Sequence, residues 1–461
     1  MNDSPGFRVQ NPTTNEIAET FETIGDEEVE QALSRAETAY RDWQAKSLEE
    51  RADVVRRVGE LFTERRDDLA EIIAEEMGKP VNEGREEAEY CGGIFGYFAD
   101  NGPRFAADQE IPTESEGKAY IQRLPIGVLL GIMPWNFPYY QVVRFAAPNL
   151  VLGNAILLKH AEICPRSARA IQQIMDDAGI PDGVYNNVFI THDQASEIIG
   201  DSRVQGVSLT GSERAGSTVA ATAGQHLKKA VLELGGSDPY IILDTDDVKE
   251  AAQTAWETRM YNTGQACDSN KRMIVAGEVY DEFVEELVSL ASAMEPGDPR
   301  DESPQVYSPL SSRGAAEKLE QQVGKAVSEG ATLHVGGKLR DDSSAYFSPA
   351  VITGITPGSE TYYEELFGPV AVVYQADSDD DAVRLANDSR YGLGGCVFST
   401  DSQRAQAVAQ RLEVGMASVN VPGGEGAELP FGGVKNSGYG RELGPLGMDE
   451  FVNKRMYFVA S

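Results

Sequence analysis

Residues 126–138 read IGVLLGIMPWNFP and carry the pattern on which the fold prediction rests. The run Ile126–Ile132 is short and apolar, which is typical of a fully buried strand. Helical patterns such as Pro165–Ala178 alternate with further runs of this kind. Alternation of buried strands with helices is typical of a parallel, doubly wound sheet, so the sequence predicts an α/β fold. The further predicted strands are Ala155–Lys159, Asn186–Ile190 and Gln205–Leu209.

Polar residues follow three of these strands, and ligands bind outside the carboxyl ends of such strands. Asn136 follows the first strand between two prolines, which fix the backbone around its amide. Glu162 follows the second strand, three residues after Lys159. Gly211 and Ser212 follow the last strand, where Ser212 can cap a helix whose N-terminus can hold a phosphate. No GxGxxG fingerprint is present, so an ordinary dinucleotide-binding loop is not indicated.

A second α/β unit is predicted from residue 235 to about residue 434. It contains the polar turn NTGQAC at 262–267, which presents the thiol of Cys267, and the segment EELFGP at 364–369. The cleft between two such units is the expected place for a small-molecule site. Each motif alone also has a plain explanation. A cysteine is more often a buried packing residue than a nucleophile. Glu233 before two glycines could simply end a strand, and a Lys/Glu pair could be a solvated ion pair.

Helices are predicted before the first sheet, and exposed strands on either side of the two units. Apolar residues recur at helical spacing after Asp26, a cap candidate. A second long helix begins at Ser47 with a capping box and ends at Gly78. Lys118–Leu124 and Phe451–Val459 are typical of exposed strands. Because an open strand edge seeks a partner, we expect both to pair across subunits.

The chain is strongly acidic: 74 acidic against 40 basic residues give a formal net charge of −34. Nucleic acid is disfavoured as a partner, because binding it needs clustered Lys and Arg. A surface this acidic repels itself at low salt and is screened at high salt. We therefore expect a halophilic protein from a salty cytosol. The alternative is a merely acidic enzyme of an ordinary cytosol.

The sequence gives no signal for a membrane, a secretory route or a metal. Its longest apolar run, Ile126–Met133, is too short to cross a bilayer. Residues 1–10 have neither a basic region nor an apolar stretch, so we expect a cytoplasmic protein. The 4 cysteines and 4 histidines are scattered, without CxxC or zinc-ligand spacing. We expect no disulfide framework and no metal site.

Taken together, the motifs resemble those of the aldehyde dehydrogenase superfamily over nearly the whole chain. The resemblance implies an α/β fold with a Rossmann-variant cofactor domain at 1–104 and 126–235. It also implies an α/β catalytic domain at 236–434 and strand-based oligomerisation segments at 105–125 and 435–461. The matched motifs follow the family's order: PWNFP at 134–138, Lys159 with Glu162, 209–216, ELGG at 233–236, GQAC at 264–267, ELFGP at 365–369 and PFGG at 430–433.

The resemblance implies a role for each matched residue. Cys267 stands where the family has its nucleophile, whose thiolate attacks an aldehyde carbon to form a thiohemiacetal. Asn136 and the backbone N–H of Cys267 match the donors that hold the oxyanion. Collapse of that oxyanion transfers hydride to a nicotinamide and leaves a thioester. Glu233 matches the general base that activates water to hydrolyse it.

The implied cofactor residues lie in both units. A carboxylate at Glu162 suits the free diol of NAD and would repel a 2′-phosphate, so we expect NAD. Lys159 and nearby basic groups leave NADP possible. The matched positions are Lys159 and Glu162 for the adenosine ribose, Ser212 with its neighbour Gly211 for the pyrophosphate, Glu365 for the nicotinamide ribose, and Phe367 and Trp135 near the nicotinamide.

The substrate prediction comes from a narrower resemblance. LLKHA at 157–161 and GRELG at 440–444 are similar to bacterial and archaeal succinate-semialdehyde dehydrogenases, which implies oxidation of succinate semialdehyde to succinate. Arg144 matches an arginine that many of them use to hold the distal carboxylate, although it could be a structural helix residue. Where some members have a second arginine, this chain has Tyr261, which supplies no charge. Asp268, next to the nucleophile, should raise the thiol pKa.

Three other functions stay open on the sequence. One is an aldehyde dehydrogenase of broad specificity for uncharged aliphatic or aromatic aldehydes. Another is a thiol hydrolase without nicotinamide, which explains Cys267 and Glu233 but not the Lys159/Glu162 pair or Glu365. The third is a non-catalytic protein with this fold, against which the joint presence of Cys267, Glu233 and Asn136 argues. The family's habit implies a homodimer or homotetramer.

Overall fold

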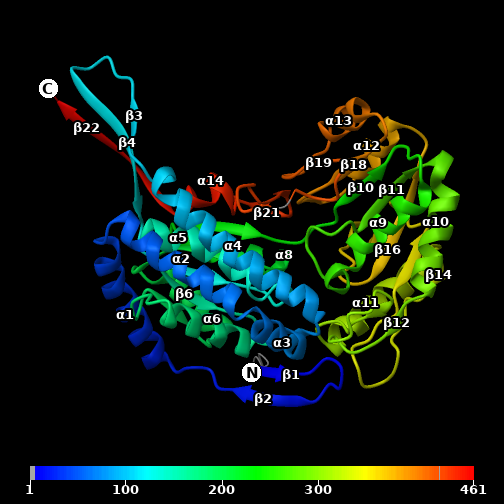
Figure 1. Cartoon of the computed structure of the whole chain (residues 1–461), viewed down its shortest axis with the longest axis horizontal. Helices are drawn as coiled ribbons and strands as arrows, with labels where there is room; N and C mark the ends of the chain where they lie inside the picture. Colours follow the sequence, from blue (N-terminus) through cyan, green and yellow to red (C-terminus); the bar gives the residue numbers. More distant parts are fainter. Residues whose placement is uncertain (1–5, 425, 461) are drawn as a thin grey trace.

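The computed structural model describes residues 6–424 and 426–460 and contains two α/β units (Figure 1). The first is built on a six-stranded sheet of order β21-β9-β8-β5-β6-β7. Strands β5 to β9 run parallel to their neighbours, whereas β21 is antiparallel to β9. The predicted doubly wound sheet is confirmed. Its strands are β5 (Val128–Ile132), β6 (Ala155–Lys159), β7 (Tyr185–Asn187), β8 (Val204–Thr210), β9 (Lys229–Glu233) and β21 (Gly438–Tyr439).

One predicted strand is displaced. β6 has the predicted bounds, and β5 and β8 differ from prediction by one or two residues at their ends. β7 ends at Asn187, although the apolar pattern continues to Ile190. The carbonyl of Phe189 accepts a hydrogen bond from the N–H of Ile24 at 2.9 Å. The end of the apolar run therefore packs against an N-terminal segment instead of extending the sheet.

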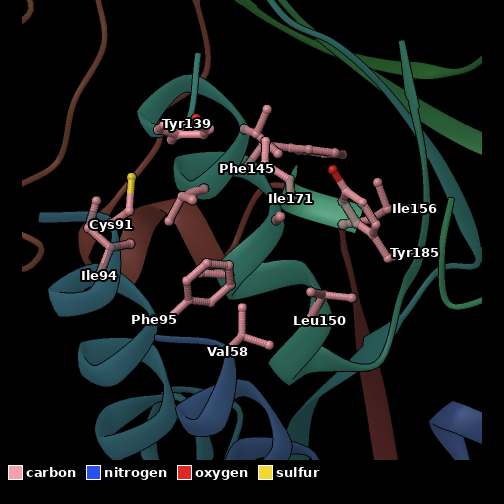
Figure 2. Close-up of a cluster of buried hydrophobic side chains, with 14 of the residues drawn as sticks. Val58, Cys91, Ile94, Phe95, Tyr139, Phe145, Leu150, Ile156, Ile171 and Tyr185 are labelled. Atoms are coloured by element: carbon pink, nitrogen blue, oxygen red, sulfur yellow. The ribbon is translucent and has the colours of Figure 1, made fainter. Parts of the chain in front are cut away.

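Helices cover both faces of the first sheet because successive strand residues point to opposite sides. Leu129 and Ile156 pack beneath the helices of one face, and Figure 2 shows part of that core. Leu130 and Leu157 pack on the other face. The first face is covered by α2 (Leu48–Glu64), α3 (Arg66–Met77), α4 (Val81–Phe105), α5 (Tyr140–Leu152) and α6 (Pro165–Asp177). The second is covered by α1 (Asp26–Gln44), α7 (His192–Gly200) and α8 (Glu213–Gln225).

The long helix predicted from Ser47 to Gly78 is two helices. Its start is confirmed, since Ser47 Oγ accepts from the N–H of Glu50 at 3.2 Å and Glu50 Oε2 accepts from the N–H of Ser47 at 2.8 Å. Arg65 has φ −104° and ψ 13°, which interrupts the helical path between α2 and α3. The stop at Gly78, which has φ 76°, is also confirmed. The cap of α1 is Gly25 and not Asp26.

The second unit contains a seven-stranded sheet of order β14-β15-β16-β11-β10-β18-β19, in which only the β14–β15 pair is antiparallel. Its strands are β10 (Pro239–Ile242), β11 (Arg272–Ala276), β14 (Thr332–Val335), β15 (Ala350–Thr353), β16 (Val370–Ala376), β18 (Cys396–Phe398) and β19 (Ser418–Val419). Its helical segments are α9 (Val248–Met260), η1 (Tyr261–Gly264), α10 (Gly277–Ser292), α11 (Arg313–Ser328), η2 (Glu360–Tyr363), α12 (Asp379–Asn387) and α13 (Ser402–Ala409).

The two strands predicted to be exposed pair with each other. β4 (Gly117–Pro125) lies antiparallel between β22 (Val452–Ala460) and β3 (Gln109–Ile111). This three-stranded sheet extends away from both units (Figure 1). β4 thus lies between two strands of its own chain, so the expectation that both strands pair across subunits is wrong for β4. Within the described residues β22 pairs with β4 alone, and its other edge is unpaired. Residues 456–459 of β22 are exposed although all four are hydrophobic.

The remaining short elements connect these sheets. They are β1 (Phe7–Gln10) with β2 (Ile17–Phe21), β12 (Glu295–Pro296) with β13 (Val306–Tyr307), β17 (Tyr391–Gly392) with β20 (Val434–Lys435), and α14 (Gly444–Met448). No helix in the described ranges combines the length and the apolar composition needed to cross a bilayer.

Candidate active site

The loop after β5 brings Asn136 to the loop that bears Cys267. Asn136 is 5% exposed, and its Nδ2 donates to the carbonyl of Gln265 at 3.1 Å. Asn262 connects the same two loops, since its Nδ2 donates to the carbonyls of Asn136 at 2.7 Å and Gln265 at 3.2 Å. The structure thus brings together an amide and a thiol loop that are far apart in the sequence.

The turn after β9 lies against the backbone of Cys267. β9 ends at Glu233, and Gly235 and Gly236 follow it. A Cβ added at Gly236 would lie 2.1 Å from the carbonyl oxygen of Cys267, so only glycine permits this approach. Lys271 Nζ donates to the same carbonyl at 2.7 Å. The strand end that carries Glu233 therefore lies beside the thiol loop.

Glu233 is a buried carboxylate, 2% exposed. In the described part of the chain, neither of its side-chain oxygens has a hydrogen-bond partner. Burial raises the pKa of Glu233 well above its ordinary value; Glu442 raises it further, and Arg144 and Arg441 oppose the rise. Buried carboxylates are normally paired, because desolvation is unfavourable. An unpartnered one with a raised pKa is suited to accept a proton from a bound molecule.

The thiol of Cys267 is half-buried and has an acidic neighbour. Burial raises its pKa, and Asp268, whose Oδ1 lies 3.9 Å from Sγ, raises it further. Arg144 and Lys271 act in the opposite direction. The expected effect of Asp268 is therefore present. Because the thiol is protonated at neutral pH in this environment, a nearby base is needed to activate it.

Lys159 and Glu162 form an ion pair at the end of β6. Lys159 Nζ lies 2.6 Å from Glu162 Oε1, and the exposed His192 has its Nε2 3.3 Å from the same oxygen. Burial opposes the charge on Glu162, but Lys159, a backbone hydrogen bond and His192 together outweigh burial, so the pKa of Glu162 is lowered. An ionised acceptor at a strand end fits the hydroxyl groups of a ribose.

Ser212 caps α8 as predicted, because its Oγ accepts from the N–H of Ala215 at 3.3 Å. The N–H of Gly211 donates to the carbonyl of Glu233 at 2.9 Å. A Cβ at Gly211 would meet only Leu209, at 3.7 Å, so a ligand can approach this backbone closely. The N-terminus of α8 therefore fits a phosphate group.

Glu365, Trp135 and Phe367 lie where the two units meet. Glu365 Oε1 accepts from the N–H of Gly236 at 3.1 Å and lies 3.2 Å from Lys271 Nζ. The rings of Trp135 and Phe367 are nearly perpendicular, with centroids 5.7 Å apart. Trp135 follows a strand of the first sheet and Phe367 precedes one of the second. A carboxylate acceptor beside flat apolar rings fits the nicotinamide half of a dinucleotide.

The two predicted substrate residues are already engaged within the protein. Arg144, on α5, is fully buried, and its Nε lies 2.8 Å from Glu442 Oε2. Its guanidinium also lies over the ring of Phe431 at 4.0 Å. Tyr261 is 37% exposed and stacks on Phe137 with ring centroids 5.9 Å apart. Arg144 is close enough to Glu233 and Cys267 to influence both electrostatically.

Sequence reasoning did not single out Asn262, Lys271 or Glu442 as site residues. Asn262 belongs to the turn before the thiol, and its positive φ of 50° has no sequence signal. Glu442 enters the sequence analysis only as part of GRELG. Across residues 6–424 and 426–460, no group of three or more His, Cys, Asp and Glu side chains could hold a metal ion.

Sequence comparison with known proteins points to the same family that the motifs resemble. The model of the aldehyde dehydrogenase family matches residues 1–457. A succinate-semialdehyde dehydrogenase (NADP+) of Deinococcus radiodurans is 50% identical, with 98% of this chain and 94% of that protein covered. A succinate semialdehyde dehydrogenase (NAD(P)+) of Escherichia coli is 40% identical, with 96% of each chain covered.

Solved structures agree with the sequence comparisons. One of them is the crystal structure of succinic semialdehyde dehydrogenase from Streptococcus pyogenes in complex with NADP+. Its TM-score to this structure is 0.96, and its sequence is 41% identical. The match covers 99% of this chain and 100% of that one. The predicted fold class and the resemblance on which it was based are both confirmed. This chain belongs to the aldehyde dehydrogenase family.

Proposed function

We propose that this protein oxidises an aldehyde to the corresponding carboxylic acid, with Cys267 as nucleophile, Asn136 as oxyanion donor and Glu233 as base. The observation that supports this most is the hydrogen bond from Asn136 Nδ2 to Gln265, two residues before Cys267. The strand end with the unpartnered Glu233 lies beside the same loop. Acyl transfer through a thiol needs these three groups.

The chain's own groups account for the proton transfers. The thiol must lose its proton before attack, since its pKa is raised, and Glu233 is the unpartnered carboxylate on the strand end beside the thiol loop. Asn136 Nδ2 and the N–H of Cys267 stabilise the negative charge that develops on the carbonyl oxygen as the C–S bond forms. Bound NAD or NADP supplies the hydride acceptor. After Glu233 has released the thiol proton to solvent, it takes a second one from the water that hydrolyses the thioester and returns it to the departing thiolate, which releases the acid and restores the thiol.

The cofactor is proposed to lie along the carboxyl ends of the first sheet. Lys159 and Glu162 would hold the adenosine ribose, Gly211 and Ser212 the pyrophosphate, and Glu365 the nicotinamide ribose. The expectation of NAD with NADP possible agrees with the relatives, whose names give NADP+ and NAD(P)+. In this proposal residues 1–104 and 126–235 form the cofactor domain, and 236–434 form the catalytic domain.

Succinate semialdehyde is the proposed substrate, because it is the substrate named for the relatives at 50% and 40% identity. Arg144 and Tyr261 would then help to bind the distal carboxylate of this substrate. Arg144 acts in this proposal through its positive charge near the thiol, since its Nε is paired with Glu442. Tyr261 would contribute from a partly exposed position.

Two observations favour a second candidate, a broad-specificity aldehyde dehydrogenase. The full burial of Arg144 and its pairing with Glu442 leave less of its charge for a substrate carboxylate. The acidic Asp268 beside the thiol would also repel a carboxylate. Uncharged aliphatic or aromatic aldehydes would avoid this repulsion.

Assembly and environment complete the proposal. The open edge of β22 and its exposed hydrophobic residues support a homodimer or homotetramer built through the segments 105–125 and 435–461. The net charge of −34 supports a halophilic protein in a salty cytoplasm.

A substrate panel tests the function. Purified protein is assayed with succinate semialdehyde, propanal and benzaldehyde, with NAD and with NADP, and reduced cofactor is followed by absorbance. The Cys267→Ala variant is the control and should give no turnover. Product acid without reduced cofactor would favour a thiol hydrolase instead. An unchanged KM for succinate semialdehyde in Arg144→Gln would remove Arg144 as a substrate determinant.

A further inference from the structure

Helix α4 holds both loops of the proposed active site from one of its faces. Glu87 is 3% exposed, and its Oε1 accepts from the N–H groups of Tyr139 at 2.9 Å and Tyr140 at 3.0 Å. These donors stand where the Asn136 loop enters α5. The other oxygen of Glu87 pairs with Lys79, whose side chain is fully buried. Glu87 thereby fixes the loop that carries the amide.

Glu83 lies one helical turn before Glu87, on the same face of α4. Its Oε2 accepts from the N–H of Asn262 at 2.7 Å. Asn262 is the residue whose side chain donates to the carbonyls of Asn136 and Gln265. Glu83 thereby contacts the loop that carries the thiol, at the residue that links it to the amide loop.

The turn that Glu83 contacts has an unfavourable backbone. Asn262 has φ 50° and ψ 36°, and Thr263 has φ 51° and ψ 36°. Left-handed values are tolerated by asparagine but are uncommon for a β-branched residue such as threonine. Conformations of this kind persist only where the surroundings hold them. Both residues are buried, so the N–H of Asn262 also needs a partner within the protein.

We propose that Glu83 is a positioning residue: its hydrogen bond to the N–H of Asn262 holds the left-handed turn that sets Cys267 against the Asn136 amide. Loss of the bond lets the turn relax toward ordinary backbone angles. The Gln265 carbonyl then moves away from Asn136, and the thiol moves with it. This inference rests on the proposed function, because it assigns Glu83 a task in the same reaction.

The bond does not require a charge on Glu83. Burial raises the pKa of Glu83 to about 7, against the opposing effects of Lys79 and the Asn262 hydrogen bond. A neutral carboxyl or an amide can still accept the N–H of Asn262 through its carbonyl oxygen. Glutamine should therefore replace Glu83, whereas alanine should not. This contrast distinguishes positioning from an electrostatic role.

The test compares Glu83→Ala and Glu83→Gln with a control on the same helix, Glu89→Ala. Glu89 forms a surface pair with Arg66 at 3.0 Å, so its removal deletes one negative charge from α4 without touching the site. We measure kcat, KM for the aldehyde and the thermal midpoint. We also measure the rate at which iodoacetamide alkylates Cys267, located by peptide mass; Cys91, Cys164 and Cys396 are buried.

We expect kcat of Glu83→Ala to fall about 10- to 100-fold, because small misplacements of reacting groups have effects of this size. KM should change less than kcat, and alkylation of Cys267 should become faster as the turn opens to solvent. Glu83→Gln should keep at least about one third of kcat, since it retains the acceptor. Glu89→Ala should match the unmodified protein in all four measurements.

Two results would overturn the inference. One is a folded Glu83→Ala protein that keeps kcat and the alkylation rate of the unmodified protein. The other is Glu83→Gln losing as much kcat as Glu83→Ala. If Glu83→Ala does not fold, Glu83→Asp decides, since its shorter side chain should lower kcat relative to Glu83→Gln. Alkylation is independent of turnover, so a failure of the proposed function would appear in the unmodified protein and not as a difference between variants.

Discussion

Glu87 and Lys79 form a buried ion pair, and replacing Glu87 with leucine should destabilise the protein more than replacing Lys79 with methionine. The side chains of Lys79 and Glu87 are 0% and 1% exposed. Removing one member of a buried ion pair leaves the other charge without its ion-pair partner, which costs about 3–5 kcal/mol. Glu87→Leu also leaves two N–H groups, of Tyr139 and Tyr140, without their acceptor, at about 1 kcal/mol or more each. The expected loss is roughly 5–7 kcal/mol.

Lys79→Met should have a smaller effect, because Glu87 keeps its two backbone donors. We expect a loss of about 2–3 kcal/mol, below the range for a stranded buried charge. The double variant should be more stable than the sum of the two losses implies, since neither buried charge remains. The assay is urea unfolding in buffered KCl, with midpoints compared at equal slope. A Glu87→Leu loss under about 1 kcal/mol, or one no larger than that of Lys79→Met, would refute the reasoning.

Three further outcomes concern activity and environment. Asn136→Ala should lower kcat about 100- to 1000-fold in steady-state assays, as the loss of an oxyanion donor does elsewhere, and a smaller effect than tenfold would exclude that role. Glu233 acts as a base only when ionised, so kcat should rise with pH as pH passes through its raised pKa; Arg144→Met, which removes an opposing charge, should move this rise to higher pH. The thermal midpoint should increase from dilute buffer to molar KCl, and an unchanged or lower midpoint would contradict the proposed halophilic character.

Much of the first sheet could be predicted because its strands are short apolar runs that the rest of the chain must bury. β6 matches its predicted bounds, since Lys159 marks its polar end. The prediction that β7 continues to Ile190 was wrong, because an apolar residue can pack against a neighbouring segment as well as within a sheet. The break at Arg65 could not be predicted, since arginine favours a helix and the interruption depends on tertiary packing.

The candidate site also has a part that could be predicted from the sequence and a part that could not. Asn136, Glu162 and Ser212 could be placed from the rule that ligands bind at strand ends. The bond from Glu83 to Asn262 spans 179 positions and depends on how α4 crosses the thiol loop, which local patterns do not encode. The pairing of Arg144 with Glu442 joins residues that are similarly remote. Burial of a charged side chain can be recognised only once its surroundings are known.

The place of β21 has a consequence for how the chain is made. Glu233 pairs with Gly438, so in the described part of the chain the outer edge of β9 is covered by residues that are synthesised long after β9 itself. Until then a nascent chain exposes an uncovered strand beside the future catalytic base, and such edges invite association with other chains. A chain that stops before residue 438 would therefore be inactive and prone to aggregation. Synthesis must therefore pass residue 438 before this edge of the sheet can close.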